Sequence, residues 1–379
     1  MFLRLLGLTY LCAFGSLWPQ ILGLTGSHGI APAANLMAAM RAQLGARAFF
    51  YTPSLFWLHT SDNALTLFCG LGCACGMLLL AGLLSRWMAA ACFVLYLSIV
   101  SVGQPFMSFQ WDALLLEAGF LALFAGAPWL AWTYRLLLFR FMFESGLVKL
   151  TSGDPNWRNL HALRYHFMTQ PLPNPIAYYM YHAPNWLLDS LTGLSIAIEL
   201  LAPFLLFFPR RLRITGVAAL MILQVAILLT GNYAFFNLLA LALCLWGLDD
   251  ATFAPLGRLL RRRFPSRNIP KSKAALRGMH GALAVLAILG LLELTGHAPA
   301  LLQPLEIVNS YGLFAVMTTS RPEIVIEGSD DRVNWKEYSF RYKPGNLHRG
   351  LPLVAPYQPR LDWQMWFAAL GRYEGYYFV

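Results

Sequence analysis

The sequence predicts an all-α polytopic membrane domain followed by a small β-sandwich-like domain outside the membrane. Of its 379 residues, 58% are hydrophobic and only 12% are charged, whereas soluble domains carry about 25% charged residues. The hydrophobic residues gather in repeated apolar runs, and helices made of such runs can cross a hydrocarbon core of ~30 Å. From about Thr295 the pattern changes to an alternation with a period of two, which is typical of β-strands.

The first apolar run covers residues 1–24 and carries one charge, Arg4. Because no cleavage pattern precedes a polar start, we expect a retained signal anchor. Residues 25–60 then form a loop with a short amphipathic helix at residues 33–44. Eight further apolar runs bring the expected number of spans to about nine, of which two or three are short enough to be re-entrant. These runs cover residues 64–84, 87–102, 111–127, 129–150, 186–208, 214–230, 233–248 and 278–294.

The positive charges predict the orientation of the spans. Residues 252–277 contain eight lysines and arginines and no acidic residue, and shorter basic turns surround Arg86 and Arg211. With nine spans, all of these fall on one side, which is the cytoplasmic side, together with the N-terminus. The C-terminal domain is then periplasmic or lumenal. The net charge of +10 is therefore explained by topology, and we expect no nucleic-acid partner.

We divide the chain into a membrane domain, residues 1–296, and a β-rich C-terminal domain, residues 297–379. Within the first, residues 151–185 form a non-cytoplasmic aromatic segment, called the central segment below. It is too polar to cross a bilayer, and aromatic rings with polar tips settle at the membrane–water interface. We expect it to contact a client protein, and the candidate contact residues in and directly after it are Trp157, Arg158, Tyr165, Gln170, Tyr178, His182 and Trp186.

The C-terminal domain begins with a hairpin pattern. Residues 323–327 alternate with a period of two, residues 328–331 form a turn, and residues 335–342 alternate again. We interpret them as a β-hairpin or as part of a small sandwich. Prolines then lead into an amphipathic helix that contains Trp363 and Trp366, which we expect to take part in the same client surface.

Ionisable residues within apolar runs are candidates for chemistry, because a charge in hydrocarbon is costly without a partner. Lys149 is a candidate base, Glu144 or Asp112 its partner, and His166 a polar contributor. Glu144 also follows Arg140 by four residues, a spacing that allows an ion pair on one helical face. Spacing alone favours a structural interpretation, in which these charges form interhelical salt bridges and Lys149 extends to the interface.

The sequence contains no established cofactor or metal motif. The central histidines, His161, His166 and His182, have separations that suit no common metal site, and no HExxH or CxxC pattern accompanies them. The six cysteines lie inside apolar runs, which favours packing over a disulfide framework. We expect no metal, and the residues name no cofactor. The absence of an Asn-x-Ser/Thr sequon favours a bacterial cytoplasmic membrane over that of the endoplasmic reticulum.

Four long stretches carry a resemblance to the lipase maturation factor family, and the resemblance covers most of the chain. They are SFQWDALLLEAGF (108–120), SGLVKLTSGDPNWRNLHALRYHFMTQPLPNPIAYYMYHAPNW (145–186), EIVIEGSDDRVNWKEYSFRYKPG (323–345) and VAPYQPRLDWQMWFAAL (354–370). The resemblance implies a polytopic membrane protein whose central loop and C-terminal part face the lumen. Eukaryotic members help secreted homodimeric lipases to fold and assemble in the endoplasmic reticulum. Members usually continue past WFAAL, so the resemblance implies a shortened C-terminal domain here.

A shorter stretch, SGLVKLTSGDPNW, is similar to the vitamin K-dependent γ-glutamyl carboxylase and its bacterial relatives. In that superfamily a lysine at the matching position serves as the base on a quinol cofactor. The similarity covers about a dozen residues and implies that role for Lys149. Shared architecture does not by itself imply shared chemistry.

Two functional hypotheses follow. The first is a membrane-bound folding or maturation factor that binds exported clients such as lipases, has membrane lipids as further partners and requires no cofactor. The second is an integral membrane enzyme acting on a lipid or quinone-like substrate, with Lys149 as base. The family resemblance favours the first hypothesis. The residues alone leave open whether the protein catalyses a reaction.

Overall fold

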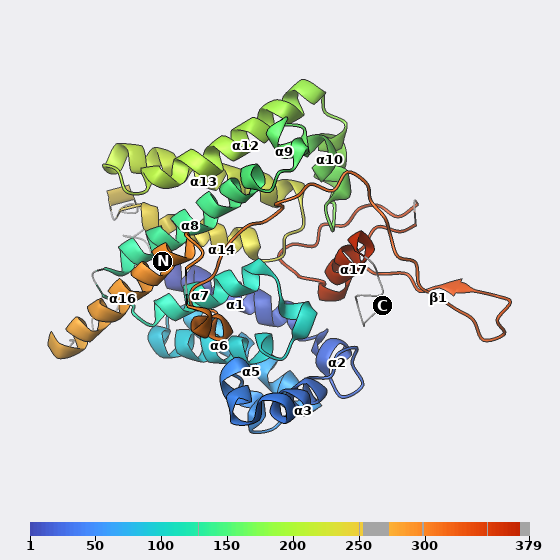
Figure 1. Cartoon of the computed structure of the whole chain (residues 1–379), viewed down its shortest axis with the longest axis horizontal. Helices are drawn as coiled ribbons and strands as arrows, with labels where there is room; N and C mark the ends of the chain where they lie inside the picture. The colour runs from blue at the N-terminus through green and yellow to red at the C-terminus, as the bar shows by residue number, and fades with distance from the viewer. Residues whose placement is uncertain (128, 250, 253–272, 298, 347, 372–379) are drawn as a thin grey trace.

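The computed structural model describes residues 1–127, 129–249, 251–252, 273–297, 299–346 and 348–371. Helices dominate this part of the chain, and one small β-hairpin extends away from the helical body (Figure 1). The N-terminal helices are α1 (Phe2–Leu17), α2 (Ile21–Thr25), α3 (Ala33–Leu44), α4 (Ala48–Tyr51), α5 (Asp62–Ala81), α6 (Ser85–Val100) and α7 (Gln110–Ala122). Short 3-10 turns η1 (Gly45–Arg47), η2 (Leu55–Trp57) and η3 (Gln104–Met107) join them.

The second half of the helical body surrounds the central segment. Its long helices are α8 (Leu130–Thr151), α12 (Asn185–Leu205), α13 (Arg210–Thr230) and α16 (Lys273–Glu293). Its short elements are α9 (Pro155–Arg158), α10 (Ala162–Thr169), α11 (Pro175–Tyr181), α14 (Phe236–Cys244) and η4 (Leu245–Gly247). The C-terminal region contains η5 (Ala300–Leu305), β1 (Glu327–Gly328), β2 (Lys336–Glu337) and α17 (Arg360–Leu370).

Each of the nine predicted apolar runs contains a helix. By length and composition, three of the helices in the described ranges could each cross a membrane, namely α5, α12 and α13, and shorter apolar helices accompany them. The expected number of about nine spans stays a prediction. The amphipathic helices predicted at residues 33–44 and around Trp363 are confirmed as α3 and α17.

Local sequence signals explain several helix ends. The Ser61 side chain accepts a hydrogen bond from the Ala64 amide at the start of α5, and Gly82 ends that helix with a positive φ of 82°. Helix α1 packs along α5, where a Cβ on Gly7 would lie 2.5 Å from the Leu80 nitrogen. Small residues at such contacts allow apolar helices to approach closely, so Gly7 is required by the packing.

The C-terminal region contains less β structure than predicted. Strands β1 and β2 pair antiparallel, with Glu327 opposite Glu337 and Gly328 opposite Lys336. Within the described ranges no second sheet covers this pair, and Val333, Trp335 and Tyr338 are exposed. A sheet face without a covering layer buries little apolar area. The described β structure is therefore a hairpin of two short strands and not a sandwich.

An ion pair in the interior fixes α17 to the helical body. The Arg360 guanidinium binds both carboxylate oxygens of Asp112 on α7, at 2.8 and 2.9 Å, and both side chains are fully buried. Tyr96 Oη donates to the same carboxylate, and Arg360 also donates to the Phe106 carbonyl oxygen at 2.7 Å. The two-point geometry suits a guanidinium and a carboxylate. The position of α17 thus depends on a charge within α7.

Removing one partner of this pair should destabilise the protein strongly. Asp112→Asn leaves the Arg360 charge buried without a counter-ion, so we expect a loss of about 3–5 kcal/mol in the free energy of unfolding. Thermal unfolding in detergent measures the loss. Asp189→Asn is the matched control, because its partner Arg164 lies at the surface, where ion pairs contribute about 0–1 kcal/mol. Equal melting temperatures for wild type and Asp112→Asn would contradict the assigned role.

Candidate functional site

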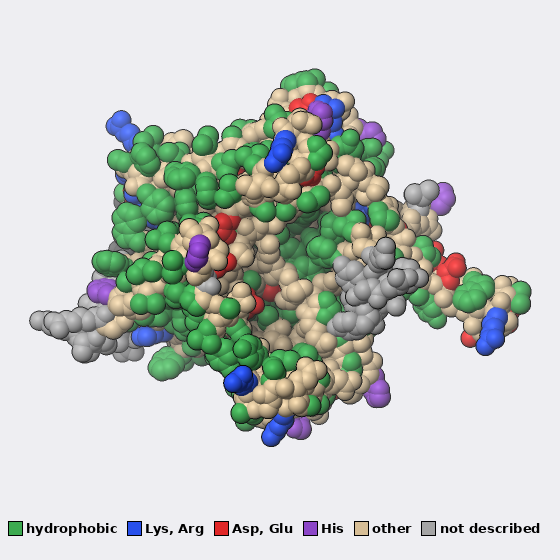
Figure 2. Space-filling view, viewed as in Figure 1, with side chains coloured by type: hydrophobic (Ala, Val, Ile, Leu, Met, Phe, Trp, Pro, Cys, Tyr) green, Lys and Arg blue, Asp and Glu red, His purple; other side chains and the backbone are tan. Residues whose placement is uncertain are grey.

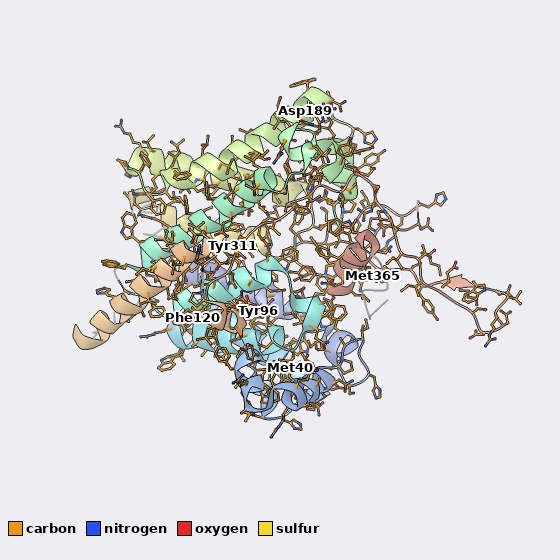
Figure 3. All side chains as sticks on the ribbon, in the orientation of Figure 1. Met40, Tyr96, Phe120, Asp189, Tyr311 and Met365 are labelled. Atoms are coloured by element: carbon orange, nitrogen blue, oxygen red, sulfur yellow. The ribbon has the colours of Figure 1, made fainter. Side chains whose placement is uncertain are left out.

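The candidate site is the junction where α8, the central segment and residues 309–321 meet. Figure 3 shows Tyr311 within the helical body and Asp189 at its edge, near the central segment. The turn that ends α8 is fixed by Asp154, whose Oδ1 accepts the Asn156 amide at 2.9 Å and caps α9. Its Oδ2 accepts the Met317 amide at 2.5 Å. One carboxylate therefore joins the central segment to the C-terminal region.

Lys149 forms a buried ion pair with α12. Its Nζ lies 2.5 Å from both carboxylate oxygens of Glu199 and 5.0 Å from the centre of the Trp157 ring. Trp157 in turn donates its indole N–H to the Phe314 carbonyl oxygen at 2.9 Å. The interhelical salt bridge expected from the structural interpretation is confirmed, but the expected extension of Lys149 to the interface is wrong, because the side chain is buried against Glu199. The ammonium donates to a carboxylate in this arrangement, so it is not a free base.

Glu144 belongs to a second network, centred on Arg140. Arg140 lies 2.8 Å from Glu117 on α7 and 3.7 Å from Glu144, which confirms the predicted i,i+4 pair. The chain at residues 309–311 completes the network. Tyr311 donates its hydroxyl to Glu117 at 2.8 Å and its amide to Glu144 at 2.6 Å, and the Asn309 amide donates to Glu117 at 3.0 Å. A C-terminal loop thus satisfies two carboxylates of the helical body.

His166 takes part in a neutral hydrogen-bond chain. Tyr233 Oη donates to Gln170 Oε1 at 2.8 Å and lies 3.0 Å from His166 Nε2. Since the hydroxyl has one proton to donate, the His166 nitrogen is the donor in the second bond. Burial and, to a smaller extent, the nearby Lys149 charge together lower the pKa of His166 to about 4. The imidazole is therefore neutral at pH 7 and positions the α10 helix.

Arg321 attaches the C-terminal region to the central segment. Its guanidinium donates to the carbonyl oxygens of Met168, Gln170 and Pro171, with 3.0 Å to the first and 2.9 Å to the last. Glu323 neutralises the arginine at 2.7 Å. Met168 lies in the last turn of α10, and Gln170 and Pro171 follow that helix, where the last carbonyl oxygens have no partner within the helix. Arg321 supplies the missing donors.

The four candidate catalytic residues do not form one constellation. Asp112 pairs with Arg360, Glu144 with Arg140, and Lys149 with Glu199, whereas His166 bonds Tyr233. In the described part of the chain, no hydrogen bond or ion pair joins any two of the four, and no group of three metal-ligating side chains occurs. Their arrangement is that of separate structural links. A catalytic role for any of them stays a prediction.

The predicted contact residues divide into buried and exposed sets. Trp157, Gln170, Trp363 and Trp366 are buried, and they offer no surface to a client in this conformation. Their apolar faces are covered because the C-terminal region packs on the helical body. Tyr165 is half-buried. The exposed members are Arg158, Tyr178, His182 and Trp186.

Sequence reasoning missed Arg360, Tyr311 and Arg321. Two features of the sequence pointed to Arg360. It is a cation at the start of an amphipathic helix, and Asp112, a carboxylate within an apolar run, requires a cationic partner. Tyr311 and Arg321 lie in irregular chain without periodicity. Nothing in the sequence indicates that this chain enters the helical body.

Comparisons with known proteins find the same family, the lipase maturation factors, in the N-terminal and the C-terminal parts of the chain. The family model described as the lipase maturation factor transmembrane domain matches residues 1–255, and the one described as the lipase maturation factor C-terminal domain matches residues 307–379. Lipase maturation factor 1 of Bos taurus is 34% identical, with 98% of this chain and 75% of the relative covered. Lipase maturation factor 2 of Homo sapiens is also 34% identical, with coverage of 98% and 71%. No solved structure matches.

Lys149→Met should destabilise the protein because Glu199 would stay buried without its cation. We expect a loss of about 3–5 kcal/mol in the free energy of unfolding, measured by thermal unfolding in detergent. The double variant Lys149→Met, Glu199→Leu should recover most of this loss, because no charge is then left unpaired. A double variant as unstable as Lys149→Met alone would contradict the pairing.

The depressed pKa of His166 predicts a pH dependence. The folded state keeps the imidazole neutral down to about pH 4, whereas the unfolded chain binds a proton near pH 6.5. Stability should therefore fall as the pH decreases from about 6.5 to 4, by roughly 1–2 kcal/mol at pH 5. Melting curves at pH 7.5 and 5 compare wild type with His166→Gln, in which this acid-dependent loss should disappear. An unchanged pH dependence in His166→Gln would refute the assignment.

Proposed function

Because the chain belongs to the lipase maturation factor family, we propose that it is a membrane-bound factor that assists the folding or assembly of exported lipases. The relatives are named for lipase maturation, and the apolar helices support an integral membrane protein. The observation that carries the proposal is the contrast within the C-terminal region. One part of it is fixed by buried ion pairs, and another extends as a hairpin that exposes Val333, Trp335 and Tyr338 among charged residues.

The hairpin is the strongest candidate for client contact. Val333, Trp335 and Tyr338 are 78%, 58% and 66% exposed, and Figures 1 and 2 show the hairpin extending beyond the helical body. Incompletely folded secretory proteins expose apolar surface and unpaired strand edges. A short hairpin with exposed side chains can bind both, because its strand edges offer main-chain hydrogen bonds.

The exposed aromatic residues of the central segment support the same proposal. Tyr178 is 55% exposed, and Tyr179 and Trp186 are 75% and 70% exposed. Arg321 and Asp154 attach this segment to the C-terminal region, so the two surfaces share one rigid support. We propose that a client contacts both of them.

We further propose the topology predicted from the charges. The N-terminus and the basic residues 252–277 lie on the cytoplasmic side of about nine spans, and the central segment and residues 297–379 lie on the other side. Residues 1–296 form the membrane domain and residues 297–379 the exported domain. The absence of sequons favours a bacterial cytoplasmic membrane as the location.

The enzyme hypothesis receives less support. It needs Lys149 as a base, yet the ammonium donates to both oxygens of Glu199. A base must present its nitrogen to the substrate, whereas this nitrogen is held against Glu199. We therefore assign Lys149 to the stability of the junction.

Lipase maturation should depend on the hairpin aromatics. Trp335→Ser combined with Tyr338→Ser removes exposed side chains without disturbing the buried ion pairs, so the protein should fold normally. Loss of two aromatic contacts of about 1–2 kcal/mol each should weaken client binding at least about tenfold. Co-expression with an exported lipase in cells that lack the factor measures enzyme activity per amount of secreted lipase.

Phe49→Ser combined with Tyr51→Ser is the matched control, since both aromatic residues are about half exposed and lie far from the hairpin in the sequence. The control should retain activity. Full lipase activity with the hairpin variant would exclude the hairpin as the contact surface. No gain in lipase activity with the wild-type protein would contradict the proposed function itself.

A further inference from the structure

An open apolar groove of about 670 Å³ lies between α8, the end of α12 and α16. Its walls are formed by Trp129, Trp132, Leu136, Phe207, Leu283 and Ala287. Trp132 and Phe207 stack with ring centres 6.1 Å apart and planes 9° apart. Neither the ion-pair networks nor the proposed client surface uses these residues.

Arginines lie beside one end of the groove, next to its wall residues Trp132 and Phe207. The Arg135 guanidinium lies 5.2 Å from the centre of the Trp132 ring and donates to the Trp246 carbonyl oxygen at 2.8 Å. Arg213 donates to the neighbouring Gly247 carbonyl oxygen at 2.8 Å. Arg210 and Arg211 follow Phe207 closely at the start of α13. Among the described side chains at this end, Asp249 is the carboxylate that opposes them.

The combination of an apolar trough and a cationic end matches one class of molecule. A hydrocarbon chain fits apolar walls that are open to the bilayer, and a phosphate group is attracted by arginines at the interface. We propose that this groove binds one anionic phospholipid, with an acyl chain along Trp132 and Ala287 and the phosphate at the arginine end. Bound there, the lipid joins α8 and α16, which pack against each other.

Native mass spectrometry tests the proposal on the full chain in mixed micelles of phosphatidylglycerol and phosphatidylcholine. Wild type should retain one phosphatidylglycerol, with at least a tenfold preference over phosphatidylcholine. Ala287→Trp places an indole in the trough and should abolish this retention. The matched control is Ile222→Trp, which changes a 67% exposed position of α13 outside the groove walls and should retain the lipid. Equal retention of both lipids, or retention in Ala287→Trp, would overturn the proposal.

A second measurement covers the case in which Ala287→Trp fails to fold. Phospholipids with brominated acyl chains quench nearby indoles, so wild type should be quenched more by brominated phosphatidylglycerol than by brominated phosphatidylcholine. Trp129→Phe combined with Trp132→Phe removes both indoles of the groove and should lose this excess. An unchanged excess in this double variant would exclude the groove as the binding site. Lipase activity in co-expressing cells is measured separately, so failure of the lipid site and failure of the maturation function are distinguishable.

Discussion

The structure depends on one constraint, that a carboxylate in an apolar interior must be neutralised. The helical body contains four such carboxylates, those of Asp112, Glu117, Glu144 and Asp154. Each of them accepts at least one hydrogen bond from the C-terminal region. Arg360 binds the first, Tyr311 binds the second and third, and the Met317 amide binds the fourth. A charge left without a partner in such surroundings costs several kcal/mol. Asp112 therefore has its counter-ion, and the other three carboxylates have these hydrogen-bond donors, only when residues 309–360 are docked.

These bonds explain why the helical body and the C-terminal region form one structural unit. Apolar packing alone would let the C-terminal region slide, because it has no direction. Ion pairs and hydrogen bonds at Arg360, Tyr311 and Arg321 fix a single register. The chain on either side of the hairpin is thereby attached to the helical body that carries the exposed rings of the central segment. Such an attachment suits a factor that holds two parts of a client relative to each other.

Much of the fold follows from periodicity and composition. The nine apolar runs, α3, α17 and the Arg140–Glu144 pair were predictable because they depend on residues close in sequence. The partner of Lys149 was not, since several acidic residues lay in apolar runs and Glu199 is 50 positions away. The burial of Trp363 and Trp366 was missed for a related reason. An amphipathic pattern shows which face of a helix is apolar, but it does not show whether another element covers that face.

The separation of Asp112 from Arg360 also has a temporal meaning. The two residues are 248 positions apart, and ribosomes add about 5–20 residues per second. The carboxylate of α7 therefore waits about 12–50 s for its counter-ion while the chain is being made. Throughout this interval the growing chain contains the Asp112 carboxylate without its ion-pair partner. A chain that stops before position 360 keeps the Asp112 carboxylate without this counter-ion.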